Sequence, residues 1–247
     1  MTDELKSYSL EPFTAYPNEP VFTNFDDSGK IYTIKIHQKG IVYASTINII
    51  LDYNKDYPSR LFQSFEIYYG DELIAKNMFP EYLTDNRIQD KKLFYITDLF
   101  PPDYFFIVDT TEKPLTFKFT RKPIKGIVND IKITYSRNTK DMTNKPVNVK
   151  HFESLIAPLF KNNNMYKYSM NVEHKPISST YHIAKGSLTN ENYSNKPIQE
   201  CEKKIIKHYI DDVRVETYNT LQGMNVYFVE IDSQIDEPLY AVMYYMY

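Results

Sequence analysis

Short runs of alternating apolar and polar residues recur along most of the chain, separated by proline, asparagine and aspartate. Successive side chains of a strand point to opposite faces of a sheet, so this period of two predicts half-buried β-strands. In the first half the runs cover residues 31–36, 44–51, 61–69, 73–75, 93–96, 104–108, 115–119 and 130–135. The Gly70-Asp71 pair between two of these runs is typical of a hairpin turn.

The second half repeats this pattern but contains two segments with a different spacing. Its strand-like runs cover residues 165–172, 180–183, 213–218, 225–231 and 239–247. Apolar residues at i, i+3, i+4, i+7 and i+8 predict a helix, and two groups have similar spacing: Phe152, Leu155, Ile156, Leu159 and Phe160, and Cys201, Ile205, Ile206, Tyr209 and Ile210. Pro158 interrupts the first group. We therefore expect one or two short helices in the connections.

The fold class follows from the number of short runs and the turns between them. Prolines fall between the runs of the first half, and a turn signal occurs roughly every ten residues, which is typical of a β-sandwich or barrel. Helical periodicity is absent there, which disfavours alternating βαβ units. We predict a mainly β chain with an N-terminal arm at 1–20, a first domain at 21–137, a polar linker at 138–149 and a second domain at 150–247.

Composition supports many strands and a soluble chain. With 23 Tyr and 15 Phe but only 6 Gly in 247 residues, the sequence favours pleated, half-buried surfaces. A net charge of -3 gives no overall basic field for nucleic acid. The single cysteine excludes an intramolecular disulfide framework and suits a reducing compartment. Neither a signal peptide nor a run of about 18 apolar residues is visible, so we expect synthesis in the cytoplasm.

Residues with catalytic or metal-binding potential are scattered rather than grouped. The histidines lack the spacing of a metal-binding helix; they are His37, His151, His174, His182 and His208. Cys201 is interpreted as a small hydrophobic residue. The Asp211-Asp212 pair has the residue type of a glycosidase or a cation site, although acidic loops are commoner than either. The glycines are isolated, without a phosphate-binding loop. We predict no enzymatic activity, no cofactor and no metal.

One contrast of charge suggests contacts between copies of the chain. The basic strip comprises Lys113, Lys118, Arg121, Lys122 and Lys125. The acidic segment comprises Glu230, Asp232, Asp236 and Glu237. They are either two solvated loops or complementary patches that pair head to tail between subunits. The strip also contains Phe117 and Phe119, which could stack on nucleic-acid bases. Alternation is expected to turn these rings inward, away from the lysines, which weakens that alternative.

Several short segments together have the pattern of a known family: residues 65–74, 166–170 with Pro176, Ser178 and Ser179, 213–215, 218–221 and 223–224. They resemble the double-jelly-roll major capsid proteins of icosahedral DNA viruses and tailless phages. The first segment is similar to the family's strand, glycine turn and strand, the second to the segment that opens the last part of the second roll, and the last three to the closing strand pair. Tyr69 stands where the family has a glycine, and the gap between Leu221 and Gly223 is shorter than in the family. The length is nearer to that of compact phage capsid proteins than to giant-virus members.

The resemblance implies two consecutive jelly-roll β-sandwiches and a virion structural protein. It further implies a homotrimer that forms a pseudo-hexagonal tile of an icosahedral shell. Its partners would be copies of itself and other virion proteins, with an inner membrane or the genome as indirect neighbours and no small-molecule substrate. Two alternatives remain: another β-rich phage component, such as a tail, baseplate or receptor-binding module, and a β-sandwich carbohydrate-active enzyme.

Overall fold

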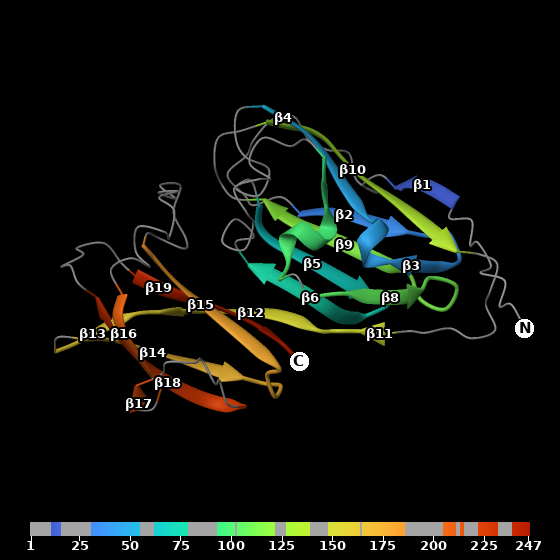
Figure 1. Ribbon diagram of the computed structural model, residues 1–247. Coiled ribbons are helices and arrows are strands. Elements are labelled where there is room, and N and C mark those ends of the chain that lie inside the picture. Colours follow the sequence, from blue (N-terminus) through green and yellow to red (C-terminus); the bar gives the residue numbers. More distant parts are fainter. Residues whose placement is uncertain are drawn as a thin grey trace, which may run out of the picture.

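The computed structural model describes residues 11–15, 31–54, 62–78, 93–101, 103–121, 127–138, 148–163, 165–185, 205–210, 213–214, 222–231 and 239–247. These residues are mainly β-strand and form three sheets, called A, B and C (Figure 1). Sheet A contains β1 (Glu11–Ala15), β3 (Ile41–Tyr43), β4 (Asn48–Asn54), β7 (Leu93–Tyr95), β8 (Phe106–Asp109), β10 (Ile127–Asn138) and β11 (Asn148–Val149). Its strand order is β11-β8-β3-β10-β4-β7, and β1 also pairs with β10.

Sheet B is shared between the two halves of the chain. In sheet order its strands are β15 (Ser178–Lys185), β19 (Leu239–Met246), β12 (Phe152–Pro158), β6 (Glu72–Met78), β5 (Phe62–Tyr69), β9 (Leu115–Arg121) and β2 (Ile31–Ile36). Sheet C, in the order β13-β14-β18-β16-β17, consists of β13 (Phe160–Asn162), β14 (Met165–Val172), β18 (Gly223–Ile231), β16 (Ile205–Ile210) and β17 (Val213–Arg214). Two short 3₁₀ turns lie in connections of sheet A: η1 (Ala44–Thr46) between β3 and β4, and η4 (Ile96–Leu99) after β7.

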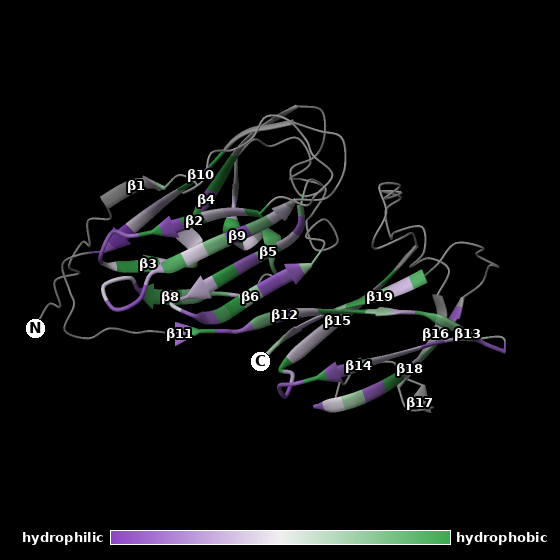
Figure 2. Ribbon diagram, turned by 180° about the vertical axis from the view of Figure 1, so that it is seen from behind, coloured by the Kyte–Doolittle hydropathy of each residue, from purple (hydrophilic) through white to green (hydrophobic). Residues whose placement is uncertain are grey.

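The alternating runs form strands because each places one set of side chains in a core. Along β2 every second residue is buried, and β5 and β6 are joined by the predicted turn at Gly70, whose φ of 63° favours glycine. Figure 2 shows apolar and polar residues following one another along β5. Sheet A and the β6-β5-β9-β2 part of sheet B enclose the first core, which includes Ile34, Phe65 and Phe117.

The second core lies between sheet C and the β15-β19-β12 part of sheet B. Its largest members are aromatic: Tyr168 and Tyr227 stack with ring centroids 4.7 Å apart, and both are buried. The Tyr181 hydroxyl lies 3.1 Å from that of Tyr227, so two buried polar groups satisfy each other. The mainly β, sandwich-like fold predicted from the sequence is therefore confirmed.

Strands β12 and β19 contribute to both cores. Tyr240, Val242, Tyr244 and Met246 belong to the first core, whereas the alternate residues of β19 belong to the second. Strand β12 pairs with β19 along its whole length and meets β6 in a parallel pair at Phe152 and Ala75. Side chains reinforce this junction, since Ser154 Oγ donates to Lys76 O at 2.9 Å and Tyr244 Oη donates to Met78 O at 2.7 Å.

The prediction of one or two short helices in the connections of the second half is wrong. Residues 152–158 form β12, in which Phe152 and Ile156 pack on the first core while Leu155 and Ala157 pack on the second. Apolar residues therefore occur on both faces of β12, and the two sets of alternate positions together have the spacing of a helix. Ile205–Ile210 likewise forms strand β16, paired with β18, because ladder pairing and β-branched residues favour the strand. Cys201 lies outside the described residues.

Only a few residues of the predicted arm and linker are described. Residues 11–15 of the predicted arm form β1, which pairs with β10. At the predicted linker, Asn138 ends β10 and Asn148–Val149 form β11, which pairs with β8, while 139–147 lie outside the described residues. The division at 138–149 stays a prediction. Within the described part of the chain, no helix has the length and apolar character needed to cross a membrane.

Candidate functional site

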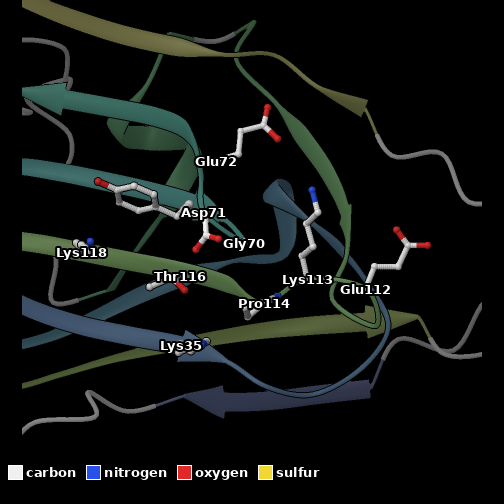
Figure 3. Close-up of a pocket in the computed structure, with 10 residues that line it drawn as sticks. Lys35, Gly70, Asp71, Glu72, Glu112, Lys113, Pro114, Thr116 and Lys118 are labelled. Atoms are coloured by element: carbon white, nitrogen blue, oxygen red, sulfur yellow. The ribbon is translucent and has the colours of Figure 1, made fainter.

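A polar hollow of about 740 Å³ opens on the outer face of sheet B in the first sandwich (Figure 3). Strands β2, β5 and β9 supply its floor, and two connections supply its rim. One is the turn between β5 and β6, and the other joins β8 to β9. The lining residues are Lys35, Tyr68, Gly70, Asp71, Glu72, Glu112, Lys113, Pro114, Thr116 and Lys118.

Strand register places the floor residues side by side. Lys35 on β2 is opposite Thr116 on β9, and Thr116 is opposite Tyr68 on β5. Direct cross-strand partners share a face of the sheet, so these three side chains form one row across the outer surface. Two residues further along β9, Lys118 is opposite Glu66 of β5.

Tyr68 is held in place by charged neighbours. Its hydroxyl donates to Glu66 Oε2 at 2.7 Å, and Lys118 Nζ lies 4.3 Å from the centroid of its ring. Burial, the hydrogen bond to Glu66 and the charge of that carboxylate raise the pKa of Tyr68 to about 12. The phenol therefore remains a neutral donor at physiological pH, and the ring and the Lys118 ammonium form a cation–π pair.

The rim depends on a close approach at Gly70. The Gly70 amide donates to Pro114 O at 2.8 Å, which fastens the β5–β6 turn to the connection before β9. A Cβ at this position would come within 3.0 Å of Lys113 Cδ, and the positive φ also favours glycine. Lys113 Nζ lies 5.4 Å from the centroid of the Tyr69 ring. Gly70 therefore allows the Lys113 stem to cover the turn.

The hollow combines ammonium and carboxylate groups on a backbone of paired strands. Lys35, Lys113 and Lys118 supply positive charges. Asp71, Glu72 and Glu112 supply negative charges. Such a surface suits charged side chains of a protein partner, because complementary charges set register and orientation. Among the described residues no group of three or more histidine, cysteine, aspartate or glutamate side chains is placed to hold a metal ion.

The structure brings two members of the basic strip together and leaves others undescribed. Lys113 and Lys118 both line the hollow. Arg121 ends β9, where its backbone pairs with Phe62, but its side chain is outside the described part, as are Lys122 and Lys125 entirely. The expected inward orientation of Phe117 and Phe119 is confirmed, since both rings are buried in the first core.

Of the acidic segment, only Glu230 is described, and it lies in the other sandwich. Glu230 is a half-buried residue of β18 in sheet C, opposite Lys207 in the register. Asp232, Asp236 and Glu237 lie outside the described residues, as do Asp211 and Asp212. Sequence reasoning missed Lys35, Tyr68 and the acids of the rim. Lys35 is more than 75 positions before Lys113, so only the pairing of β2 with β9 brings them to one surface.

Comparison with known proteins shows similarity in fold. No protein-family model matches the chain, and no curated protein matches its sequence. Among solved structures, it is similar to the crystal structure of the major capsid protein P2 from bacteriophage PM2, with a TM-score of 0.50 and 13% sequence identity. The match covers 96% of this chain and 97% of that chain. The chain therefore has the fold of a phage capsid protein across nearly its whole length.

Proposed function

We propose that the chain is a major capsid protein, a virion structural protein whose trimers assemble into an icosahedral shell. The observation that carries this proposal is the match to a phage major capsid protein over 96% of the chain. In the proposal the two sandwiches are consecutive jelly rolls, divided at 138–149. The mature protein resides in the virion, after synthesis in the host cytoplasm, beside other virion proteins and with a membrane or the genome as indirect neighbours. It acts by self-assembly and without catalysis.

A fold in which most strands are paired within sandwiches suits a subunit that is packed against many copies of itself. Sandwiches that hide their strand edges avoid uncontrolled edge-to-edge pairing at high concentration. Polar hollows and loops are then left to make specific contacts.

Purified protein is expected to form trimers and pseudo-hexagonal tiles. Size-exclusion chromatography with light scattering measures the trimer, and negative-stain microscopy shows the tiles. A strictly monomeric protein at micromolar concentrations contradicts the proposal. Ring-shaped oligomers would instead favour a tail or baseplate component, and cleavage of a glycan would favour an enzyme.

The basic strip is proposed to dock on the acidic segment of a neighbouring subunit. Lys113 and Lys118 belong to the first sandwich and Glu230 to the second, and this separation suits head-to-tail contacts between copies. Complementary patches of this kind fix the register of assembly.

Reversing two charges of the strip tests this docking. The K113E/K118E variant is expected to associate at least about tenfold more weakly, a loss of about 1.4 kcal/mol, and a second reversal in the acidic segment, E230K/E237K, should restore part of the association. Analytical ultracentrifugation measures both. Lys167→Glu is the matched control, because Lys167 is an exposed lysine of sheet C outside both patches. Unchanged association of K113E/K118E contradicts the docking.

A further inference from the structure

Two histidines stack on one tyrosine where the two sandwiches meet. The ring of Tyr247, which follows β19, lies parallel to those of His174 and His151, with centroid distances of 4.1 and 5.1 Å and interplanar angles of 13° and 19°. His151 directly precedes β12, and His174 belongs to the turn 173–177 between β14 and β15. We call these three residues the histidine–tyrosine stack.

Backbone hydrogen bonds set the position of the rings. The Tyr247 amide donates to His151 O at 3.1 Å, and the His151 amide donates to Tyr247 O at 3.2 Å, which continues the pairing of β12 with β19. The Ile177 amide donates to Met246 O at 2.7 Å and holds the turn that carries His174. The stack is therefore a consequence of the sheet and not of a chance contact between mobile side chains.

A carboxylate of the first sandwich completes the arrangement. His151 Nε2 lies 2.9 Å from Glu72 Oε1, and Glu72 is the first residue of β6. Tyr245 Oη donates to Glu153 Oε2 at 2.5 Å beside the stack. Burial, followed by the charges of Glu153, Glu72 and Glu173, raises the pKa of Tyr247 to about 12. The surroundings of the Tyr247 ring are thus negatively charged.

Positive charges near the stack are directed elsewhere or exposed. Lys150 Nζ lies 5.0 Å from the Phe105 ring centroid and donates to Asp103 O at 2.9 Å, while Lys175 is exposed. The titratable groups around the stack are Glu72, which contacts His151, and Glu153, Glu173, Tyr104 and Tyr245, which lie near Tyr247; Lys150 and Lys175 are the sequence neighbours of the two histidines. Among these, only Glu72 forms an ion pair with a stacked histidine, and it does so when His151 is protonated.

We propose that the histidine–tyrosine stack is an acid-strengthened lock between the two sandwiches. When His151 and His174 carry protons, each presents a cation to the face of Tyr247, and His151 also forms an ion pair with Glu72 across the junction. When they lose their protons, only neutral stacking and the backbone pairing remain. Glu72 also lines the polar hollow, so the lock and the hollow share one carboxylate.

The sign of the pH dependence follows from the charge that each contact needs. Both the ion pair and the cation–π contacts require a protonated histidine. In the proposal their contribution to stability is therefore present at acidic pH and lost at alkaline pH.

A double-mutant cycle on the unassembled protein tests the lock independently of shell formation. The thermal unfolding midpoints of the wild type, E72Q, H151Q and E72Q/H151Q are measured at about pH 5.5 and about pH 8. At the lower pH, the decrease caused by the double substitution should differ from the sum of the two single decreases by about 2–4 °C, the shift typical of 1 kcal/mol in a chain of this size. At the higher pH, the two single decreases should add up to that of the double variant. H174Q should likewise lower the midpoint more at the lower pH.

His37→Gln is the matched control, because His37 is exposed after β2; its midpoint should shift equally at both pH values. Equal coupling at both pH values, or none at either, overturns the proposal. If H151Q does not fold, E72Q alone carries the test, since the Glu72 side chain is 52% exposed and its amide replacement removes only the charge. An E72Q midpoint that differs from wild type equally at both pH values also overturns it. Neither result depends on whether the protein assembles.

Discussion

Replacing Phe152 with alanine is expected to lower the free energy of unfolding by about 3–5 kcal/mol, the range for removing a buried phenylalanine ring. The Phe152 side chain is 2% exposed, and its ring centroid lies 5.2 Å from that of Phe100, 5.8 Å from that of Tyr104 and 6.0 Å from that of Tyr244. It belongs to a strand of the second half but packs in the first core. The cavity would therefore weaken the first core and its attachment to the second sandwich together.

Chemical denaturation followed by far-ultraviolet circular dichroism measures this loss. Calorimetry should show in addition that the unfolding transition of Phe152→Ala broadens or splits, because the halves lose part of their coupling. Phe160→Ala is the matched control, since the Phe160 side chain is 65% exposed and the same substitution there should change stability by less than about 0.5 kcal/mol. A cost below about 1 kcal/mol for Phe152→Ala would show that the ring does not join the two halves.

Phe65→Ala is expected to cost a similar amount, about 3–5 kcal/mol, but to leave the coupling of the halves intact. Phe65 is fully buried, and its ring lies 4.7 Å from that of Phe119, 5.9 Å from that of Phe100 and 6.2 Å from that of Phe117, measured between centroids. Removing it opens a void where β5 packs inside the first sandwich, without removing a side chain of β12 or β19.

The same denaturation measurement applies, with Phe105→Ala as control. Phe105 is a partly exposed ring of the first sandwich, and its loss should cost much less than that of Phe65. The two core variants are distinguished by calorimetry, since Phe65→Ala should retain a single transition. Equal costs for Phe65→Ala and Phe105→Ala would contradict the assignment of Phe65 to the core.

Most strands could be predicted because only one face of each is buried. In β2 and β9, and in β5 after Ser64, the alternation of apolar and polar residues matches alternate burial, and the Gly70 turn was visible as well. The exceptions are informative. Strand β12 has a core on each side, so its apolar residues occupy both faces and the period of two disappears. A local pattern contains no information about a second core built by distant strands.

The polar hollow was only partly visible for a related reason. Lys113 and Lys118 lie in one charged run, so the sequence singled them out. Lys35 and Tyr68 join them only through the registers of β2 with β9 and of β5 with β9. The histidines were interpreted as isolated residues, and the stack on Tyr247 depends on the pairing of β12 with β19 and on the turn after β14.

The dual role of β19 has a consequence for biosynthesis. Because β19 follows all the other described strands in the sequence and contributes Tyr240, Val242, Tyr244 and Met246 to the first core, the first sandwich cannot complete its interior until β19 has been synthesised. Domains that are independent commonly fold in order of synthesis. Here the first sandwich waits for a strand that begins about 100 residues beyond the end of β10, so its interior stays open until that strand has left the ribosome.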